Sequence, residues 1–315
     1  MIMAIVTVYV VAGKNYLTVN SKTGYQQTTP LKGTIAGIRF SWTVDYIMQE
    51  VAYTMDYHTI TQYAIALCKQ AGAIIVEGYY RDDITIDYKS RTNLVTDIDY
   101  ESEKYIVSKL KEQFPDFDIV AEEGGLECAD GEYIWYVDPL DATNNFAHKI
   151  PWFCVTIALY SKALEAAVAG VVYEPLRDEC FYAWKDGGAY VNEKRIFVSQ
   201  INDIGISIIA TGFPYKKDDP SCNNAKQFNN VLPNVQGIRR MGSAAIDLSY
   251  VACGRFDGYW EPLLYPWDMT AGALLVKEAG GMVTQYNGNT FDPEFPEICA
   301  TNGLIHQQLL ELINK

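Results

Sequence analysis

The chain has 315 residues, 49% of them hydrophobic, which suffices for a large core in one or two domains. Its 39 acidic and 25 basic residues give a formal net charge of −14 without any basic stripe, which argues against direct binding to nucleic acid. No apolar run predicts a membrane span. The seven cysteines form no C-x-x-C pair and the three histidines lie far apart, which favours a cytoplasmic protein with reduced thiols over a disulfide framework or a zinc site.

Segment 1–54 carries the weakest pattern in the chain. Residues 4–12 are apolar, lack the basic start and the cleavage site of a signal peptide, and allow a short strand. Residues 13–44 show no helical period. We therefore set 1–54 apart as an N-terminal extension of uncertain status. It is either a lineage-specific addition or sequence translated from a misplaced start, with Met48 or Met55 as the true one.

An amphipathic helix is predicted from Asp56 onward. Apolar residues recur at steps of three and four from Ile60 to Ile74, which places them on one helix face. Gly78 is the nearest breaker after this pattern and is predicted to end the helix. The polar stretch that follows, 84–89, resembles one arm of a hairpin.

Segment 93–103 contains the start of a second helix. Thr96, Asp97 or Asp99 can cap it, because each offers a side-chain oxygen to the free N–H groups of the first turn. A cap is the better interpretation of Asp99 when this segment is taken alone.

Segment 116–125 predicts a short strand that ends in two carboxylates and a glycine turn. Because side chains alternate along a strand, Glu122 and Glu123 are expected to point in opposite directions, one toward a site and the other toward solvent. A solvated acidic loop is the simpler interpretation of both residues when the segment is taken alone.

The most informative stretch is 135–146. Residues 133–137 are aromatic and β-branched and predict a buried strand, which Pro139 is expected to stop. Asp141 then opens a helix or helical turn. Asp138 and Asp141 can hold a hard cation, and N–H groups at a helix start can hold a phosphate. The combination suggests metal-assisted chemistry on a phosphate ester, although ordinary turn and cap chemistry explains the stretch alone equally well.

The second half of the chain changes character near residue 200. Before that point an antiparallel meander is predicted, with strands at 153–160, 166–173 and 179–184 and a hairpin at 187–192. After it, strands alternate with helical segments, which favours an α/β arrangement. We therefore divide the remaining chain into an N-terminal α+β half, 55–200, with the antiparallel sheet and the metal site, and a C-terminal α/β half, 201–315, which completes that site.

The last acidic residue of interest is Asp268. It precedes an apolar-periodic helix that ends near Gly280, so its position is that of an N-cap. Each acidic residue thus has a structural explanation of its own. Together they lie at the ends of predicted elements, where sites are usually built; they are Asp99, Glu122, Asp138, Asp141 and Asp268.

These residues fall in sequence blocks that resemble the inositol monophosphatase family, and its bacterial members in particular. The blocks occur in the family's order at 94–99, 121–123, 135–146, 240–247, 267–272 and 278–281. The Asp-Pro-Leu-Asp block together with the Trp-Asp block is a specific signal. The resemblance extends from about residue 56 to the end of the chain. It implies a layered αβαβα fold, spanning the α+β and α/β halves, and a Mg²⁺-dependent phosphatase of phosphate monoesters.

The resemblance also implies a role for individual residues. Those expected to hold Mg²⁺ are Glu122, Asp138, the Leu140 carbonyl, Asp141 and Asp268. The first ion would take Glu122, Asp138 and Leu140, the second would take the three aspartates, and Glu122 would help hold a weaker third. Catalysis would use Asp99 with Thr143 to orient and deprotonate water, together with Glu122. Those expected to contact substrate are Asp141, Ala142, Thr143, Ser243, Ala244, Glu261 and Asp268. Lys89 lies where the family often has a lysine near the site.

Elementary electrostatics supports this expectation independently. Two like charges about 4 Å apart repel by about 4 kcal/mol at an effective dielectric near 20, so clustered carboxylates take up protons or need cations. Oxygen ligands favour Mg²⁺, Mn²⁺ or Ca²⁺ over zinc. One departure stands out: Ala142 occupies a position where the family usually has glycine. Alanine would be strained there if the backbone is left-handed, and would be tolerated if it begins an ordinary helix.

Several functions remain open at the level of sequence. We favour a cytoplasmic inositol 1-phosphate phosphatase, inhibited by lithium and active as a homodimer, with no nucleic-acid or membrane partner. The alternatives within enzymes are phosphatases of fructose bisphosphate, 3′-phosphoadenosine nucleotides, histidinol phosphate or NADP. The apolar segment 261–266 leaves this preference undecided. The alternative of another class is an interaction protein in transcription or ribosome assembly.

Overall fold

The computed structural model describes residues 5–11, 14–20, 26–30, 56–127 and 130–315, in two units, 1–55 and 56–315. In the first unit, β1 (Ile5–Val11), β2 (Lys14–Asn20) and β3 (Gln26–Pro30) form an antiparallel sheet in that order. The short strand expected in 4–12 is therefore confirmed. The two proposed start residues, Met48 and Met55, lie outside the described residues.

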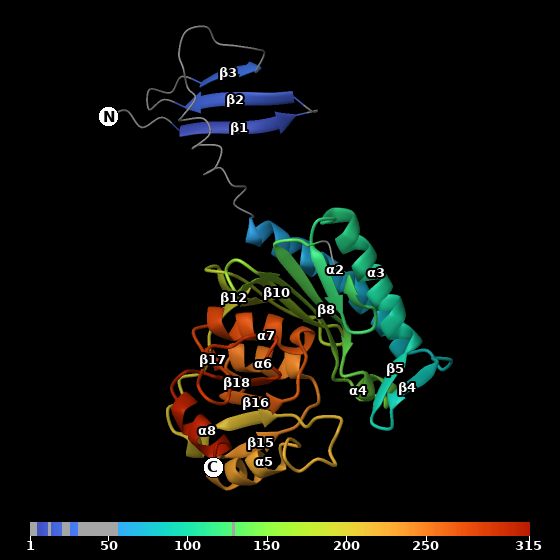
Figure 1. Cartoon of the computed structure of the whole chain (residues 1–315), viewed down its shortest axis with the longest axis vertical. Coiled ribbons are helices and arrows are strands. Elements are labelled where there is room, and N and C mark those ends of the chain that lie inside the picture. Colours follow the sequence, from blue (N-terminus) through green and yellow to red (C-terminus); the bar gives the residue numbers. More distant parts are fainter. Residues whose placement is uncertain (1–4, 12–13, 21–25, 31–55, 128–129) are drawn as a thin grey trace. The chain divides into compact units, whose positions relative to one another are not determined.

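The second unit begins with two helices packed on a large sheet. Helices α2 (Tyr57–Tyr79) and α3 (Asp97–Gln113) lie on one face of an eight-stranded sheet with the order β13-β12-β11-β10-β9-β8-β6-β7 (Figure 1). Its strands are β6 (Asp118–Ala121), β7 (Gly125–Glu127), β8 (Tyr133–Asp141), β9 (Cys154–Ser161), β10 (Ala166–Glu174), β11 (Glu179–Trp184), β12 (Gly188–Val191) and β13 (Lys194–Ile196). Neighbours from β8 through β13 are antiparallel, which confirms the predicted meander.

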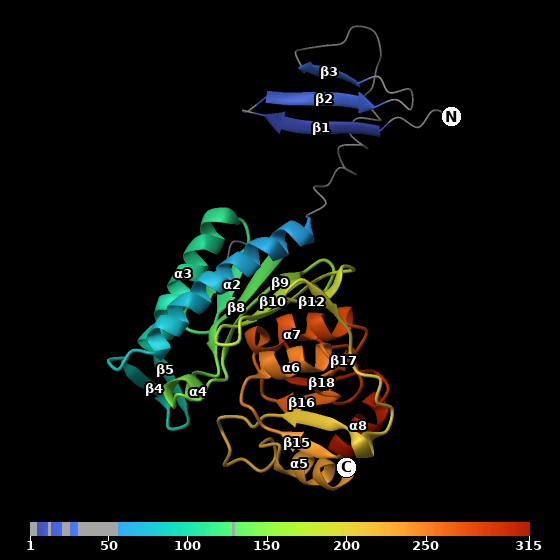
Figure 2. The same cartoon turned by 180° about the vertical axis from the view of Figure 1, so that it is seen from behind.

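A second, five-stranded sheet has the order β15-β14-β16-β18-β17. Its strands are β14 (Ile208–Thr211), β15 (Gly237–Arg239), β16 (Gly258–Pro262), β17 (Met282–Thr284) and β18 (Glu297–Thr301). Helices α6 (Ala244–Ala252) and α7 (Pro266–Glu278) lie between the two sheets, while α5 (Ala225–Val231) and α8 (His306–Ile313) cover the outer face (Figures 1 and 2). The layers are therefore αβαβα, as predicted.

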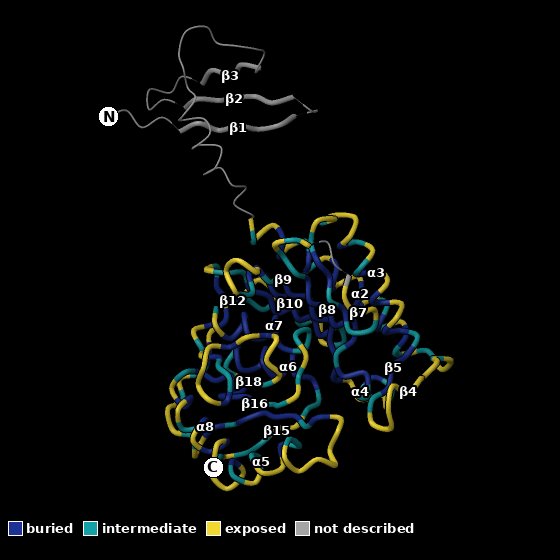
Figure 3. The backbone as a smooth tube through the Cα atoms, in the orientation of Figure 1, coloured by how far each residue is buried: buried dark blue, intermediate teal, exposed yellow. Residues whose placement is uncertain are grey.

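The main hydrophobic core fills the space between the two sheets. It combines side chains from strands of both sheets with those of α6 and α7, and these segments are the buried, dark blue part of the tube in Figure 3. The close fit is visible at Gly170 on β10, where a Cβ would lie 3.0 Å from the Cα of Ala271 on α7. This packing makes α7 a rigid support for the residues at its N-terminal end.

Helix α2 differs from the prediction in two details. Its buried face includes Ile75 rather than Ile74, and Gly78 lies inside the helix instead of ending it. A Cβ at Gly78 would approach Ile98 of α3 to 2.6 Å, so the glycine allows two helices to pack closely. By length and composition α2 would suffice to cross a bilayer, with a mean hydropathy of 1.2, contrary to the sequence expectation. Its buried face, however, packs on β10 and α3.

The predicted hairpin and helix cap are both present next to this helix. Strands β4 (Ile86–Ser90) and β5 (Asn93–Thr96) pair antiparallel, and β5 leads directly into α3. Thr96 is the N-cap, and its side chain accepts the N–H of Ile98 at 3.2 Å. The hairpin therefore delivers the start of α3 to the same region as the end of β8.

The end of β8 corrects a second expectation. Pro139 does not stop the strand, which continues to Asp141 and pairs with β9 through Asp141 and Cys154. The register shifts between Asp138 and Asp141, because the chain bulges where the proline offers no N–H. The short helix α4 (Thr143–Ala147) follows, as predicted. Both aspartates therefore lie at the C-terminal end of β8.

Candidate active site

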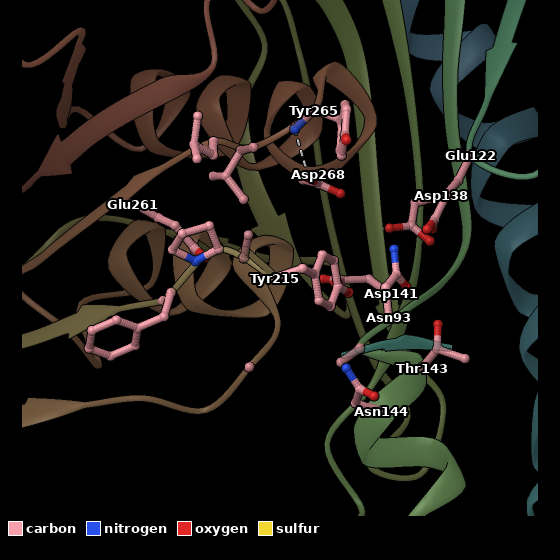
Figure 4. Close-up of a pocket in the computed structure, with 18 of the residues that line it drawn as sticks. Asn93, Glu122, Asp138, Asp141, Thr143, Asn144, Tyr215, Glu261, Tyr265 and Asp268 are labelled. Carbon is pink, nitrogen blue, oxygen red and sulfur yellow. Dashed lines mark hydrogen bonds between the residues drawn. The ribbon is translucent and has the colours of Figure 1, made fainter. Parts of the chain in front are cut away.

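A pocket of about 100 Å³ lies where the ends of β6 and β8, the start of α4, the start of α7 and the loop after β14 meet (Figure 4). Residues expected from the sequence that line it are Glu122, Asp138, Leu140, Asp141, Ala142, Thr143, Ala244, Glu261 and Asp268. Elements from both halves of the second unit contribute to these walls. Two expected site residues, Asp99 and Ser243, do not line the pocket and instead lie behind residues that do.

The aspartates of this pocket repel one another where solvent has limited access. Asp138 is 2% exposed, and its Oδ1 accepts the N–H of Leu140 at 3.1 Å. Burial raises its pKa well above the usual value, and Glu122, Asp141 and Asp268 raise it further. Burial likewise raises the pKa of Asp268 well above its usual value, with Asp141 and Glu122 adding to the effect. Such carboxylates are stabilised by protons or by a cation.

Asp141 is held by three donors on one of its oxygens. Its Oδ2 accepts from the Ser243 hydroxyl, from the N–H of Ala245 at 3.3 Å and from the Cys154 thiol at 3.7 Å. Burial raises its pKa to about 6, while Ser243 and Ala245 oppose the shift. Ser243 is also the N-cap of α6, so the start of that helix fixes the carboxylate. Donors crowd Oδ2, which leaves Oδ1 for the pocket.

Asp99 and Thr143 form a hydrogen-bonded pair beside the pocket. The Thr143 hydroxyl lies 2.9 Å from Oδ1 of Asp99 and 3.1 Å from the Leu140 carbonyl oxygen. Oδ2 of Asp99 accepts the Thr96 N–H at 2.8 Å and its hydroxyl at 2.5 Å. Asp99 is thus the third residue of α3 and part of a capping box, so the structural and functional interpretations of this residue are compatible. Burial raises the pKa of Asp99 to about 6.

Glu122 and Glu123 do not point in opposite directions, which corrects the expectation for this pair. Both lie in a turn after β6, where strand alternation no longer applies, and both accept from Nζ of Lys89, at 3.0 and 2.5 Å. The Glu123 side chain is 2% exposed rather than solvated. Burial raises its pKa to about 7. Lys89, from the β4–β5 hairpin, therefore places a positive charge beside Glu122 at the pocket wall.

Asp268 is not the N-cap of α7, which corrects another expectation. The helix begins at Pro266 with Tyr265 as the N-cap, and Asp268 is its third residue. Its Oδ2 accepts the Tyr265 N–H at 2.7 Å, the dashed line in Figure 4. The carboxylate thereby satisfies the helix start and faces Asp138 across the pocket.

Ala142 resolves the alternative posed by the sequence. Its φ is 70° and its ψ is 45°, so it is left-handed and not an ordinary first residue of a helix. This conformation costs alanine roughly 1 kcal/mol relative to glycine. The turn nevertheless forms, because β8 and α4 determine the path of the chain on either side.

The donor set suits a hard cation in chemical terms. The oxygen-only side chains come from Glu122, Asp138, Asp141 and Asp268, and burial with mutual repulsion favours a positive ion among them. Among residues 56–127 and 130–315, no three acidic, histidine or cysteine side chains already surround one point at ligand distance. One oxygen of each aspartate accepts a hydrogen bond from a backbone or side-chain donor, and Glu122 pairs with Lys89.

Several residues that line the pocket were not named individually as site residues from the sequence. They are Asn93, Asn144, Asn145, Phe213, Pro214, Tyr215, Arg240 and Trp267. Leu263, Leu264 and Tyr265 also line it, and they belong to the apolar segment 261–266 that the sequence had already related to substrate preference. Tyr215 lies on the loop after β14, and its carbonyl accepts the Thr92 hydroxyl at 2.9 Å. Burial and then the carboxylates raise the pKa of this tyrosine. The only sequence signal for it is a Gly-Phe-Pro-Tyr turn directly after a strand.

The αβαβα layers and this acidic pocket at the end of β8 define a layered α/β fold with a carboxylate-lined site. Within that class the chain belongs to the inositol monophosphatase family, because the sequence model of that family matches residues 56–315. It shares 42% identity over 227 residues with the Nus factor SuhB of Pasteurella multocida, covering 71% of this chain and 84% of that protein. It shares 44% identity over 222 residues with the inositol-1-monophosphatase of Synechocystis, covering 70% and 77%.

Solved structures of relatives have the same fold. The suhB protein of Bartonella henselae superposes with a TM-score of 0.77 at 37% identity, covering 82% of this chain and 99% of that one. The inositol monophosphatase of Anabaena superposes with a TM-score of 0.74, also at 37% identity, covering 82% and 96%. The relatives thus carry two kinds of name, inositol monophosphatase and SuhB.

Proposed function

We propose that the chain hydrolyses phosphate monoesters with Mg²⁺, and that inositol 1-phosphate is its preferred substrate. The observation that carries this proposal is that Glu122, Asp138, Asp141 and Asp268 all line one pocket. Their mutual repulsion favours a cation, and a cation would reverse the local field that otherwise repels a phosphate. Family membership supports the same reaction class.

The acidic residues would be divided among the metal ions, with Asp138 shared by two of them. Glu122, Asp138 and the Leu140 carbonyl would hold a first Mg²⁺, and Asp138, Asp141 and Asp268 a second, with Glu122 supporting a weaker third. When bound, Mg²⁺ supplies charge stabilisation for the ester and a lowered pKa for water. Oδ1 of Asp141, which accepts none of the three bonds described above, and the carboxyl of Asp268 would then hold the second ion in position.

Thr143 and Asp99 would move the proton. The Thr143 hydroxyl can accept a hydrogen bond from the attacking water while it donates its own proton to Oδ1 of Asp99, 2.9 Å away. The raised pKa of Asp99 suits a group that must accept a proton near neutral pH. No side-chain nucleophile is needed, so the reaction is a direct displacement by water.

The remaining contacts would bind the ester. The N–H groups of Ala142 and Thr143, at the turn into α4, would hold phosphate oxygens. Ala244 and Glu261, which line the pocket away from β8, would face the alcohol. Ser243 lies behind Asp141, so its contribution would be to hold that carboxylate in place.

Phosphate release from inositol 1-phosphate tests this proposal. The purified chain is assayed with Mg²⁺ and with excess EDTA, next to Asp141→Asn and a matched control, Asp186→Asn, whose side chain is 83% exposed and outside the pocket. We expect release that requires Mg²⁺, that is lost in Asp141→Asn and that persists in Asp186→Asn. Release that continues in EDTA, or that survives Asp141→Asn, would contradict the metal mechanism.

Two related proposals concern substrate and assembly. Release from fructose bisphosphate, 3′-phosphoadenosine nucleotides, histidinol phosphate or NADP, but not from inositol 1-phosphate, would favour one of these alternatives. We also propose a homodimer and inhibition by lithium, as the family resemblance implies. Light scattering that gives a monomer mass, or activity that persists at high lithium, would overturn these two proposals.

A second candidate function is a part in transcription. Relatives at 42% and 39% identity are named Nus factor SuhB, which is the observation in its favour. An interaction of this kind need not use the acidic pocket. Co-purification of transcription proteins with the chain, retained in Asp141→Asn, would establish it independently of hydrolysis.

A further inference from the structure

Leu263 has a backbone conformation that leucine rarely adopts. Its φ is 61°, in the left-handed region where a Cβ crowds the following carbonyl. The N–H groups of Leu263 and Leu264 both donate to the Pro296 carbonyl, at 2.5 and 3.3 Å. These bonds fix the segment between β16 and α7, so the strained conformation is determined by its surroundings.

Packing in the core does not account for a leucine at this position. Leu263 lines the acidic pocket and is 41% exposed. Glycine would fit the same backbone without strain and would leave no apolar side chain in contact with solvent. Strained residues gather at ligand sites, so the geometry indicates that the side chain has a role in the pocket.

Two aromatic residues add apolar surface to the same pocket. The rings of Tyr265 and Trp267 stack with centroids 4.9 Å apart and planes 10° apart, and both line the pocket. Tyr265 is 54% exposed. We call Leu263, Leu264, Tyr265 and Trp267 the apolar shelf. Glu261 precedes the shelf on β16, so a carboxylate borders an apolar wall within one pocket.

On the basis of the proposed phosphatase function, we propose that the apolar shelf contacts the C–H face of a ring-shaped alcohol and thereby selects cyclic over acyclic alcohol phosphates. A hydroxylated ring has apolar faces and a polar edge. The shelf would cover a face while Glu261 accepts hydrogen bonds from the edge. An acyclic alcohol offers no continuous face and loses more rotational freedom when bound.

Two variants test the shelf through a ratio of rates. For wild type, Leu263→Gly and Tyr265→Ser, kcat/KM is measured with Mg²⁺ on inositol 1-phosphate and on glycerol 2-phosphate. We expect the wild type to prefer the cyclic ester, and each variant to lose about tenfold of that preference, as for the loss of a small apolar contact. The Tm of Leu263→Gly is expected to be equal to or above that of wild type, because glycine removes the strain.

Glu165→Gly is the matched control. Glu165 also has a positive φ, 47°, but lies outside this pocket, so its replacement should keep the wild-type ratio. An unchanged ratio in Leu263→Gly, or a clear fall in its Tm, would overturn the inference, because the leucine would then be inert or a core residue. A wild type that hydrolyses both esters equally would overturn the inference while phosphatase function stands. A wild type that hydrolyses no phosphate ester would overturn the proposed function and the inference with it.

Discussion

The Thr143 hydroxyl lies 2.9 Å from Oδ1 of Asp99, a carboxylate without exposed surface. The two residues are 44 positions apart, and α3 and α4 bring them together at the edge of the pocket. A buried carboxylate next to a hydroxyl that faces the pocket is suited to accept a proton through that hydroxyl.

This relationship predicts the effect of Asp99→Asn. The amide cannot take a proton at Oδ1, so we expect kcat to fall by about a hundredfold or more, the usual size of general base catalysis. Steady-state kinetics with Mg²⁺ checks the prediction, and Tm confirms that the variant is folded.

Asp97→Asn provides the control for that substitution. Asp97 lies on the same helix, accepts the Thr85 N–H at 3.0 Å and does not line the pocket. We expect its kcat to remain near wild type. Equal losses in both variants would mean that Asp99 matters only for the start of α3, and its role in proton transfer would be rejected.

The repulsion among buried carboxylates predicts that Mg²⁺ stabilises the fold. A cation that binds only the native state adds about 2.7 kcal/mol at a hundred times its Kd. Tm should therefore rise with Mg²⁺ relative to EDTA at matched ionic strength. Asp138→Asn should melt above wild type in EDTA, because a buried charge is removed, and should gain less from Mg²⁺.

Thermal unfolding of both proteins across a Mg²⁺ series measures this difference. The decisive quantity is the shift between EDTA and saturating Mg²⁺, which does not depend on the absolute stability of either protein. A wild type with no such shift would contradict a metal site at these aspartates.

The left-handed backbone of Ala142 predicts that glycine is better tolerated there. Ala142→Gly should stabilise the chain by about 1 kcal/mol, or raise Tm by about 2 °C for a domain of this size. Ala73→Gly, at a solvent-exposed position within α2, should instead lower the free energy of unfolding by about 1 kcal/mol. Thermal unfolding of the pair gives opposite signs if the φ of Ala142 is positive in solution, and the same sign if it is not.

Much of the fold could be predicted because its signals are local. The periodicity of α2, the apolar runs of β9 to β11 and the turn at Asp141 are all encoded within short segments. The residues at which helices and strands end were harder to predict. A strand continued past Pro139 and a helix past Gly78, because a bulge and a close helix contact changed what those residues usually do.

The residues of the candidate site also fall into predictable and unpredictable groups. Asp138, Asp141 and Asp268 stand out by their sequence blocks, and the structure brings them to one pocket. Contacts between segments that are distant in the chain could not be predicted from any pattern in the sequence. Thr92 meets Tyr215 across 123 positions, and Lys89 meets Glu123 across 34. Such pairs depend on how hairpin β4–β5 and the loop after β14 pack, which composition and periodicity do not specify.

The last prediction concerns stability in acid. His306 is 4% exposed, with its ring nitrogens 2.9 Å from the Thr284 hydroxyl and 3.0 Å from the Thr301 hydroxyl. Burial lowers its pKa from 6.5 to about 4. Between these values the unfolded chain binds a proton that the native chain does not, so stability is lost as the pH falls from about 6.5 toward 4.

We expect this single histidine to account for up to about 3 kcal/mol of the acid-induced loss, from 1.36 kcal/mol for each pKa unit. His306→Gln removes the titrating group, so its unfolding free energy should fall less steeply over the same pH range, even if it begins lower than wild type. His148→Gln removes an exposed histidine and should keep the wild-type slope. Denaturant unfolding at a series of pH values measures the slopes. Parallel curves for wild type and His306→Gln would show that the ring is protonated equally in both states, contrary to its burial between the two threonines.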